Sequence, residues 1–188
     1  MIVIGGGASA VESLEFASHE DAKKVYILSR SEKWIIPRNP VIDMLFALNI
    51  FGQETSLSWI PEFLLRKFFY RDLHVIAPAG KGLFTDTPMV NTDVMDKLRS
   101  GQAEWVRCDI ERFTENGVRI NRRQKGVPVG GPGCQEVIEG DMVIMATGFK
   151  RPQLSFLPDD CFQKPYSPPN WYLQTFPPHH PSISAINW

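Results

Sequence analysis

The sequence lacks most features that would place it in a membrane, in an oxidising compartment or on a nucleic acid. Its three cysteines in 188 residues are far apart, without the spacing of a redox pair, a metal site or a disulfide framework. Its net charge is −1, whereas a nucleic-acid-binding domain usually presents a basic face. The first residues lack the basic flank and long apolar run of a signal peptide. The most apolar stretch, residues 41–51, is shorter than a bilayer span and contains Asp43. These absences favour a soluble cytoplasmic protein with no integral membrane segment and no nucleic-acid partner.

Several enzyme classes also lack their motifs. None of the four tyrosines has a lysine four positions later, as a short-chain dehydrogenase would. Residues 7–11 lack the closing glycine of a serine nucleophile elbow. His179 and His180 have no third ligand at a recognisable spacing, so we expect a solvated loop and no metal site there. No catalytic residue is predicted within the sequence.

The beginning of the sequence carries the strongest positive signal. Residues 1–4 are an apolar run typical of a buried parallel strand, and residues 11–17 have helical apolar spacing. Between them, Gly5, Gly7 and Ala10 form the G-x-G-x-x-A fingerprint of a dinucleotide-binding turn. Gly5 would permit the tight turn, Gly7 the approach of a pyrophosphate, and Ala10 close packing of the helix on the strand. A glycine-rich turn without a ligand is the alternative. We predict cofactor contacts from Gly5, Gly6, Gly7, Ala8, Ser9 and Ala10.

A second strand, predicted over residues 24–28, ends at Ser29 and Arg30. NAD-binding domains usually place an acidic residue here, about 20 residues past the glycines, to bind the ribose 2′-hydroxyl. Arg30 instead suits a 2′-phosphate, through a charge-assisted contact. The rival acids Glu20 and Asp21 precede the strand, and an ordinary surface arginine is the alternative. The pattern favours NADP over NAD, with Ser29 and Arg30 in the site.

The remaining sequence alternates between regular and irregular segments. The predicted elements are helices over residues 41–51, 60–69 and 91–100, and strands over residues 104–108, 117–120, 136–138 and 142–146. The aromatic-rich residues 34–73 either pack onto the core or cover a face that meets another domain. Residues 126–133 are rich in glycine and predict an exposed, mobile loop. The apolar run 142–146 is typical of a buried strand.

These elements predict an α/β fold. We expect a Rossmann-like dinucleotide-binding domain over residues 1–150, with a parallel sheet, a helical insertion over residues 34–73 and a small antiparallel unit. An irregular, proline-rich tail over residues 151–188 follows. Since both faces of the parallel strands are apolar, helices or loops should cover both.

The motifs in combination resemble the NADPH-binding domain of flavin-containing monooxygenases. The shared segments are Gly5-x-Gly7-x-Ser9-Ala10, Arg30 with the nearby Trp34 and Pro37, Ala146-Thr147-Gly148-Phe149, and residues 172–178 and 181–186. Family members insert the NADPH fold into an FAD fold, and the resemblance places Thr147 and Gly148 in the cofactor site near the junction. In the family, NADPH reduces FAD, which delivers one oxygen atom to nitrogen or sulfur of a small substrate, or to a ketone in Baeyer–Villiger relatives.

The sequence departs from the family in one respect. Residues 1–188 contain a single glycine fingerprint, and the family's separate FAD fingerprint is absent from them. We therefore expect this chain to be the NADPH-binding portion of such an enzyme and to be inactive alone. It would associate with an FAD-binding domain, and FAD would bind only when that missing portion is present. The alternative is a non-catalytic, truncated protein that binds a nucleotide or a partner.

Overall fold

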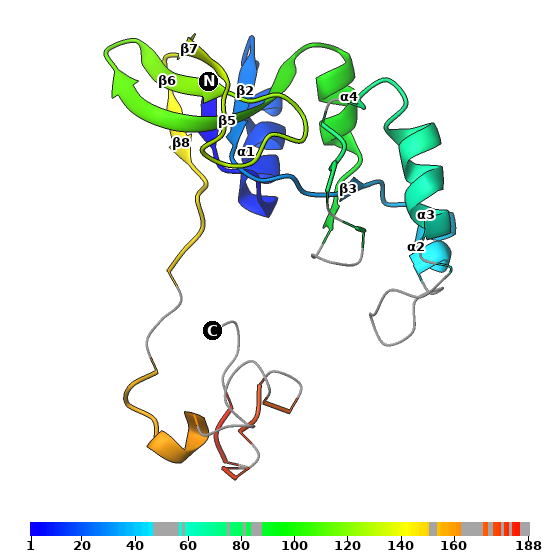
Figure 1. Ribbon diagram of the computed structural model, residues 1–188, viewed down its shortest axis with the longest axis vertical. Helices are drawn as coiled ribbons and strands as arrows, with labels where there is room; N and C mark the ends of the chain where they lie inside the picture. The colour runs from blue at the N-terminus through cyan, green and yellow to red at the C-terminus, as the bar shows by residue number, and fades with distance from the viewer. Residues whose placement is uncertain are drawn as a thin grey trace. The chain divides into compact units, whose positions relative to one another are not determined.

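The chain folds into two compact units, Met1–Gly148 and Phe149–Trp188. The computed structural model describes residues 1–46, 57, 59–74, 76–80, 82–83, 88–150, 154–162, 171–172, 175–177, 179–180 and 182–184. The first unit carries the main sheet and its helices (Figure 1). Among the described helices, none combines the length and apolarity needed to cross a membrane.

A six-stranded mixed sheet organises the first unit. Its strands are β1 (Ile2–Ile4), β2 (Val25–Ser29), β5 (Ala103–Thr114), β6 (Gly117–Arg122), β7 (Cys134–Glu139) and β8 (Val143–Met145), in the order β7-β6-β5-β2-β1-β8. Strands β8, β1, β2 and β5 are parallel, and β5, β6 and β7 are antiparallel. The predicted α/β class is confirmed, with β1 between two neighbours and β6 paired with β7.

Helices cover one face of the parallel strands. Helix α1 (Ala8–His19) follows β1 directly, and helix α4 (Asp93–Arg99) precedes β5 (Figure 1). Buried side chains of α1, among them Leu14, pack on Val3 of β1 and Ile27 of β2. This is the arrangement that the apolar spacing of residues 11–17 predicts, because one helical stripe meets alternate residues of each strand.

The opposite face is covered by strands, which corrects the expectation of helices or loops. Strand β5 does not end at residue 108 but continues to Thr114, with a bulge between Ile110 and Arg112. Such a bulge bends a strand and increases its twist. Strands β6 and β7 thereby bring Val118, Ile120 and Ile138 into one buried cluster with Ile2, Ile4, Leu28 and Val106.

Strand β8 is not the buried strand that its apolar run predicts. It lies at the edge of the sheet and pairs only with β1 among the described strands. Val143 and Met145 are 37% and 60% exposed, while Ile144 packs on the helix-side core. A continuous apolar run does not distinguish an edge strand from a central one, because that depends on whether a further strand joins the sheet.

Residues 34–90 form an insertion between β2 and α4. Its elements are β3 (Ile35–Ile36), α2 (Pro40–Phe46), α3 (Trp59–Leu64), the π-helical turn η1 (Leu65–Phe69) and β4 (Met89–Val90). Strands β3 and β4 pair in parallel as a separate two-stranded sheet. Its described helical elements lie between Pro40 and Phe69, and β4 follows them. The predicted helix over residues 41–51 is described only to Phe46, and its remaining residues lie outside the described part.

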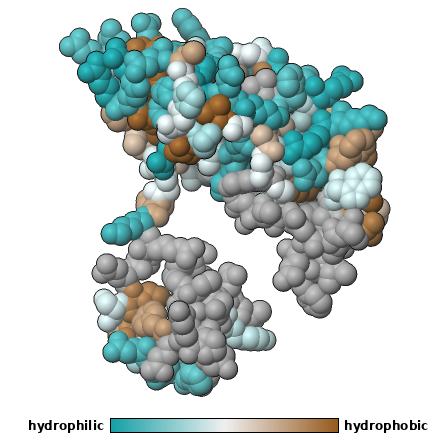
Figure 2. Space-filling view, in the orientation of Figure 1, coloured by the Kyte–Doolittle hydropathy of each residue, from teal (hydrophilic) through white to brown (hydrophobic). Residues whose placement is uncertain are grey.

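The aromatic residues of the insertion divide between its interior and its surface. Trp34 and Tyr70 are buried with edge-to-face rings 5.7 Å apart, and the Tyr70 hydroxyl accepts from the Ile35 N–H and donates to its carbonyl, both at 2.8 Å. Burial raises the pKa of Tyr70 to about 12. Trp59 and Phe68 are more than 60% exposed. Apolar side chains are visible at the end that carries α2 and α3 (Figure 2). The buried aromatic side chains thus pack inside the first unit, as one of the two alternatives predicts, and the exposed ones leave apolar surface on the insertion.

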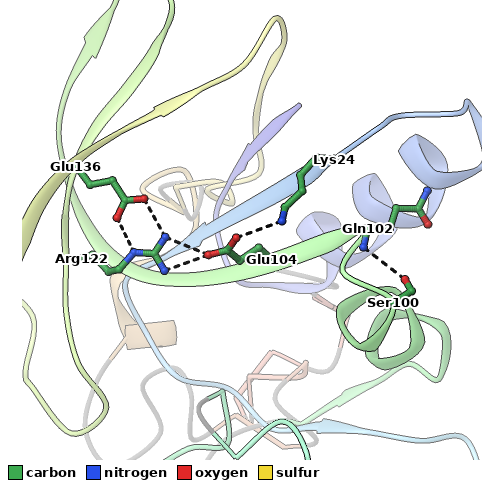
Figure 3. A network of polar contacts seen from close by, with 6 residues as sticks. All are labelled: Lys24, Ser100, Gln102, Glu104, Arg122 and Glu136. Carbon is green, nitrogen blue, oxygen red and sulfur yellow. Dashed lines mark hydrogen bonds and ion pairs between the residues drawn. The ribbon is translucent and has the colours of Figure 1, made fainter.

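An ion-pair network joins the parallel strands to the antiparallel ones (Figure 3). Arg122 of β6 contacts Glu136 of β7 at 2.7 Å and Glu104 of β5 at 3.1 Å, and Lys24, just before β2, lies 3.5 Å from Glu104. The hydrogen bonds that Arg122 donates to the carboxylates of Glu136 and Glu104 hold the pKa of its guanidinium above the usual value. The cation therefore sits between two carboxylates from different strands.

Removing the shared cation should destabilise the sheet moderately. We expect Arg122→Met to lower the free energy of unfolding by about 1 kcal/mol, because the pairs are one-third exposed and partly screened by solvent. Lys24→Met, at the outer end of the network, should cost less than half as much. Urea unfolding followed by circular dichroism measures both. Equal costs for the two variants would contradict a central role for Arg122.

The three cysteines differ sharply in exposure. Cys134 is exposed, whereas Cys108 and Cys161 are buried, and burial raises the pKa of Cys108 to about 11 and also raises the pKa of Cys161. Only about one Cys108 thiol in a thousand is ionised at pH 8, and the thiolate is the reactive form. In a disulfide-exchange assay of the native chain we expect one rapidly reacting thiol, and this fast reaction should be absent in Cys134→Ser. The thiols of Cys108 and Cys161 should react only in denaturant. Two fast thiols in the native chain would contradict this.

Candidate functional site

A cavity of about 810 Å³ opens where the parallel strands β1, β2 and β8 end. Its walls include the last residue of β1, the glycine turn, the end of β2 and the segment after β8. The predicted site residues that line it are Gly5, Gly6, Gly7, Ala8, Ser9, Ser29, Arg30, Thr147 and Gly148. Ligands of open α/β sheets bind at the carboxyl ends of the strands, so the cavity lies where a dinucleotide site is expected. The acids Glu20 and Asp21 precede β2, at its other end.

The three glycines of the turn have different structural roles. Gly5 has φ +133°, and a Cβ there would lie 2.1 Å from the Ala146 carbonyl oxygen. A Cβ on Gly6 would lie 2.1 Å from the Ser29 hydroxyl. A Cβ on Gly7 would meet nothing within 4 Å. Gly5 and Gly6 are therefore required by the fold, while the open space at Gly7 leaves its backbone accessible to a ligand.

The beginning of α1 faces this open space with its capping position unused. Gly7 is the N-cap, makes no side-chain capping bond, and has no acidic residue after it in the first turn. The N-terminus of a helix carries unpaired N–H groups and a partial positive charge, which favour an anion. Ala10, fully buried against the sheet, does not line the cavity but allows α1 to pack closely. Ala10 is predicted to contact the cofactor, but in the structure its role is to let α1 pack on the sheet.

Two cations give the cavity a positive character. Arg30 is exposed at the end of β2, and Lys33 lines the same cavity three residues later. Asp109 is the one acidic side chain among the cavity's described lining residues, and Arg123 neutralises it at 2.8 Å. The cavity therefore suits an anionic ligand. Lys33 was not anticipated from sequence, although its spacing from Arg30 could have suggested it.

Glu32 lies between these two cations in sequence but does not oppose them in the cavity. Its carboxylate pairs with Arg107 of β5 at 2.9 Å, and both side chains are largely buried. Burial lowers the pKa of the Arg107 guanidinium and the Glu32 charge raises it. The acid nearest Arg30 in the chain is thereby compensated, so it does not reproduce the acidic ribose contact of NAD-binding domains.

Arg123 fastens three separate segments around the cavity. Its side chain is almost fully buried, and its guanidinium donates to the carbonyls of Arg30 at 2.6 Å and Val127 at 2.8 Å, besides pairing with Asp109. Asp109 also accepts from the Gly130 N–H at 3.0 Å. Arg123 therefore positions the backbone of Arg30. Nothing in the local sequence distinguishes it from the neighbouring arginine, Arg122.

The same bonds hold the loop at residues 126–133, which the sequence predicts to be exposed and mobile. The loop is mainly exposed, as predicted, but Arg123, Asp109 and Asn121 hold its backbone, the last through a 3.0 Å bond to the Gly131 carbonyl. Val129 and Gly130 line the cavity. The loop thus forms one wall of the site.

Ser29 and the segment after β8 occupy different positions around the cavity. The Ser29 side chain is buried beneath the turn and its hydroxyl donates to the Ser31 carbonyl at 2.8 Å. It supports the turn from below. Gly148 has φ +83° and follows Thr147 at the rim. A second cavity, of about 620 Å³, shares Ala8 and Lys33 with the first and extends along α1.

Comparison with known proteins supports the resemblance seen in the motifs. No protein-family model matches the chain. A probable FAD-binding monooxygenase from Acinetobacter baylyi is 25% identical to it over 179 residues, covering 80% of this chain and 34% of the relative. The chain thus spans about a third of the length of the curated relative it matches. The predicted resemblance to flavin monooxygenases is thereby confirmed in sequence.

Two solved structures are also similar in part. The reduced form of ornithine hydroxylase from Pseudomonas aeruginosa matches with 20% identity and a TM-score of 0.38, over 81% of this chain and 37% of that one. L-lysine 6-monooxygenase from Pseudomonas syringae matches with 20% identity and a TM-score of 0.39, over 80% of this chain and 35% of that one.

Proposed function

We propose that this chain, a sequence relative of flavin-dependent monooxygenases, is the NADPH-binding portion of an enzyme that oxygenates a small organic substrate. The observation that carries the proposal is the cavity at the carboxyl ends of β1 and β2, which brings the glycine turn and Arg30 together. Its open space at Gly7, uncapped helix start and net positive lining fit a nucleotide with an additional phosphate.

Each part of the site has a role in this proposal. The turn at Gly7 and the first N–H groups of α1 would hold the pyrophosphate, and Arg30 with Lys33 would hold the 2′-phosphate. Arg123 is a positioning residue, because it acts through the Arg30 carbonyl and the loop wall. When bound, NADPH supplies a hydride for the reduction of a flavin. Thr147 and Gly148, at the rim, would border the bound cofactor.

The direct test is the affinity of the 188-residue chain for NADPH and NADH. We expect NADPH to bind about 10 to 100 times more tightly, since a contact to a charged group contributes about 1.5–3 kcal/mol. Isothermal titration calorimetry with both nucleotides measures the ratio. Equal affinities, or binding of neither nucleotide, would count against an NADPH site.

A second measurement separates NADPH binding from flavin binding. The one glycine fingerprint is assigned to NADPH, so we expect this chain to purify without flavin and to show no thioether-dependent NADPH oxidation when FAD is added. The visible absorption spectrum and an oxidation assay test this. Stoichiometric bound flavin would assign the glycine turn to FAD and overturn the proposal.

A further inference from the structure

The second unit brings together three metal-ligating side chains that the nucleotide site does not use. Asp160, Cys161 and His180 each offer one ligand atom, and these atoms all lie within 4.8 Å of one another. Contrary to the expectation from sequence that no metal site lies at His179 and His180, we propose that this cluster is a zinc-binding site with the Asp160 carboxylate, the Cys161 thiolate and the His180 imidazole as ligands. The site lies wholly within the unit Phe149–Trp188 and does not depend on the proposed nucleotide function.

The first two ligands come from one short, well-anchored element. Asp160 and Cys161 are neighbours on the 3-10 helix η2 (Asp159–Phe162), in the orange segment of Figure 1. The Cys161 N–H donates to the Pro158 carbonyl at 3.0 Å, and the buried Trp171 indole donates to the Cys161 carbonyl at 2.9 Å. These two bonds hold the backbone of Cys161 in place.

The third ligand comes from a turn near the end of the chain. The His180 N–H donates to the Pro177 carbonyl at 3.1 Å, and the His180 carbonyl accepts from the Ile183 N–H at 3.0 Å. Its Nε2 atom lies 2.8 Å from the Asp160 carboxylate. The turn thus presents the imidazole directly to η2, although the two residues are 20 positions apart in sequence.

This donor set matches the coordination chemistry of zinc. Thiolate, imidazole and carboxylate bind zinc at about 2.0–2.3 Å, which places the ligand atoms of a tetrahedral site about 3.3–3.8 Å apart. The Asp160–His180 pair reaches this spacing if its 2.8 Å contact opens by about half an ångström. The Cys161 sulfur, which lies within 4.8 Å of both other ligand atoms, would move closer to them by up to about 1 Å. The metal would replace that hydrogen bond and displace the Cys161 thiol proton to solvent, and water would complete the coordination.

The three ligand side chains differ in solvent exposure, as expected for a metal site with one open coordination position. The Cys161 side chain is buried, His180 is partly exposed and Asp160 is exposed. The soft thiolate ligand would therefore lie on the inner side, and an ion could enter past the carboxylate. A thiolate beside an imidazole selects zinc over magnesium or calcium, which prefer oxygen ligands only.

Metal binding by the whole 188-residue chain tests the proposal. We expect one equivalent of zinc in a competition titration with a chromophoric chelator. Cobalt(II), used as a spectroscopic probe at the same site, should give thiolate-to-metal charge-transfer absorption, which coordination by nitrogen and oxygen alone does not produce. No zinc binding, or bound cobalt without the thiolate band, would overturn the proposal.

Matched variants locate the site. Cys161→Ser should abolish the thiolate band, and both Cys161→Ser and His180→Ala should weaken zinc binding at least about tenfold, since even indirect partners of a metal affect affinity by about 10–100-fold. Cys134→Ser, in the first unit, and His179→Ala, beside the third ligand, should keep both properties. Loss of the band in Cys134→Ser would overturn the assignment. If Cys161→Ser fails to fold, persistence of the band in Cys134→Ser and Cys108→Ser assigns it to Cys161.

Discussion

Replacing Gly5 by alanine is expected to lower the free energy of unfolding by about 3 kcal/mol. An L-residue in a sparsely populated region of positive φ costs roughly 1–3 kcal/mol, and steric overpacking costs about as much again. Both apply at Gly5, where φ is +133° and the new Cβ would lie 2.1 Å from the Ala146 carbonyl oxygen. This carbonyl belongs to the backbone and cannot rotate away. Thermal unfolding should show a midpoint lowered by about 6–12 °C.

Gly7→Ala is the matched control, because the same chemical change meets open space. Its backbone, at φ −101°, is one that alanine adopts readily, so stability should change by less than about 0.5 kcal/mol. Its methyl group would instead enter the space assigned to the pyrophosphate and weaken NADPH binding about tenfold or more. A Gly7→Ala chain that binds NADPH normally would contradict the assigned position of the cofactor. A stable Gly5→Ala chain would contradict the close approach of β1 and β8.

Replacing Arg30 by alanine is expected to remove most of the preference for NADPH over NADH. The exposed guanidinium has its backbone carbonyl held by Arg123, and loss of a charge-assisted contact costs about 1.5–3 kcal/mol, or about 10 to 100-fold in affinity. NADH affinity should change little, because NADH has no 2′-phosphate. Arg30→Lys should be intermediate, since lysine keeps the charge but loses the bidentate geometry.

The control for Arg30 is a second cation on the same cavity wall. Lys33→Ala should reduce NADPH affinity less than Arg30→Ala, because a flexible ammonium offers a single point charge. Titration of each variant with both nucleotides gives the four affinities needed. An equal loss of NADPH and NADH binding in Arg30→Ala would show that the arginine acts on the fold or on a part common to both nucleotides.

Local pattern accounts for the parts of the site that could be predicted. Strand β1, the glycine turn and the start of α1 are consecutive, so the order of apolar, glycine and helical residues was sufficient to predict them. Arg30 was predictable for a similar reason, since it ends the strand after that helix. The antiparallel pairing of β6 with β7 also followed from short runs flanking a glycine-rich loop.

Long-range contacts decided the rest. Arg123 and Arg122 are adjacent and chemically alike, yet one is buried against the Arg30 carbonyl, 93 residues away in sequence, and the other joins three strands at the surface. The apolar run of β8 did not reveal its position at the sheet edge. Asp160 and His180 meet only because two turns of the second unit face each other. The sequence by itself thus determined the glycine turn and the class of fold, because local periodicity encodes them. The tertiary structure alone decided the contacts of Arg123, the edge position of β8 and the meeting of Asp160, Cys161 and His180, because each depends on residues that no local pattern connects.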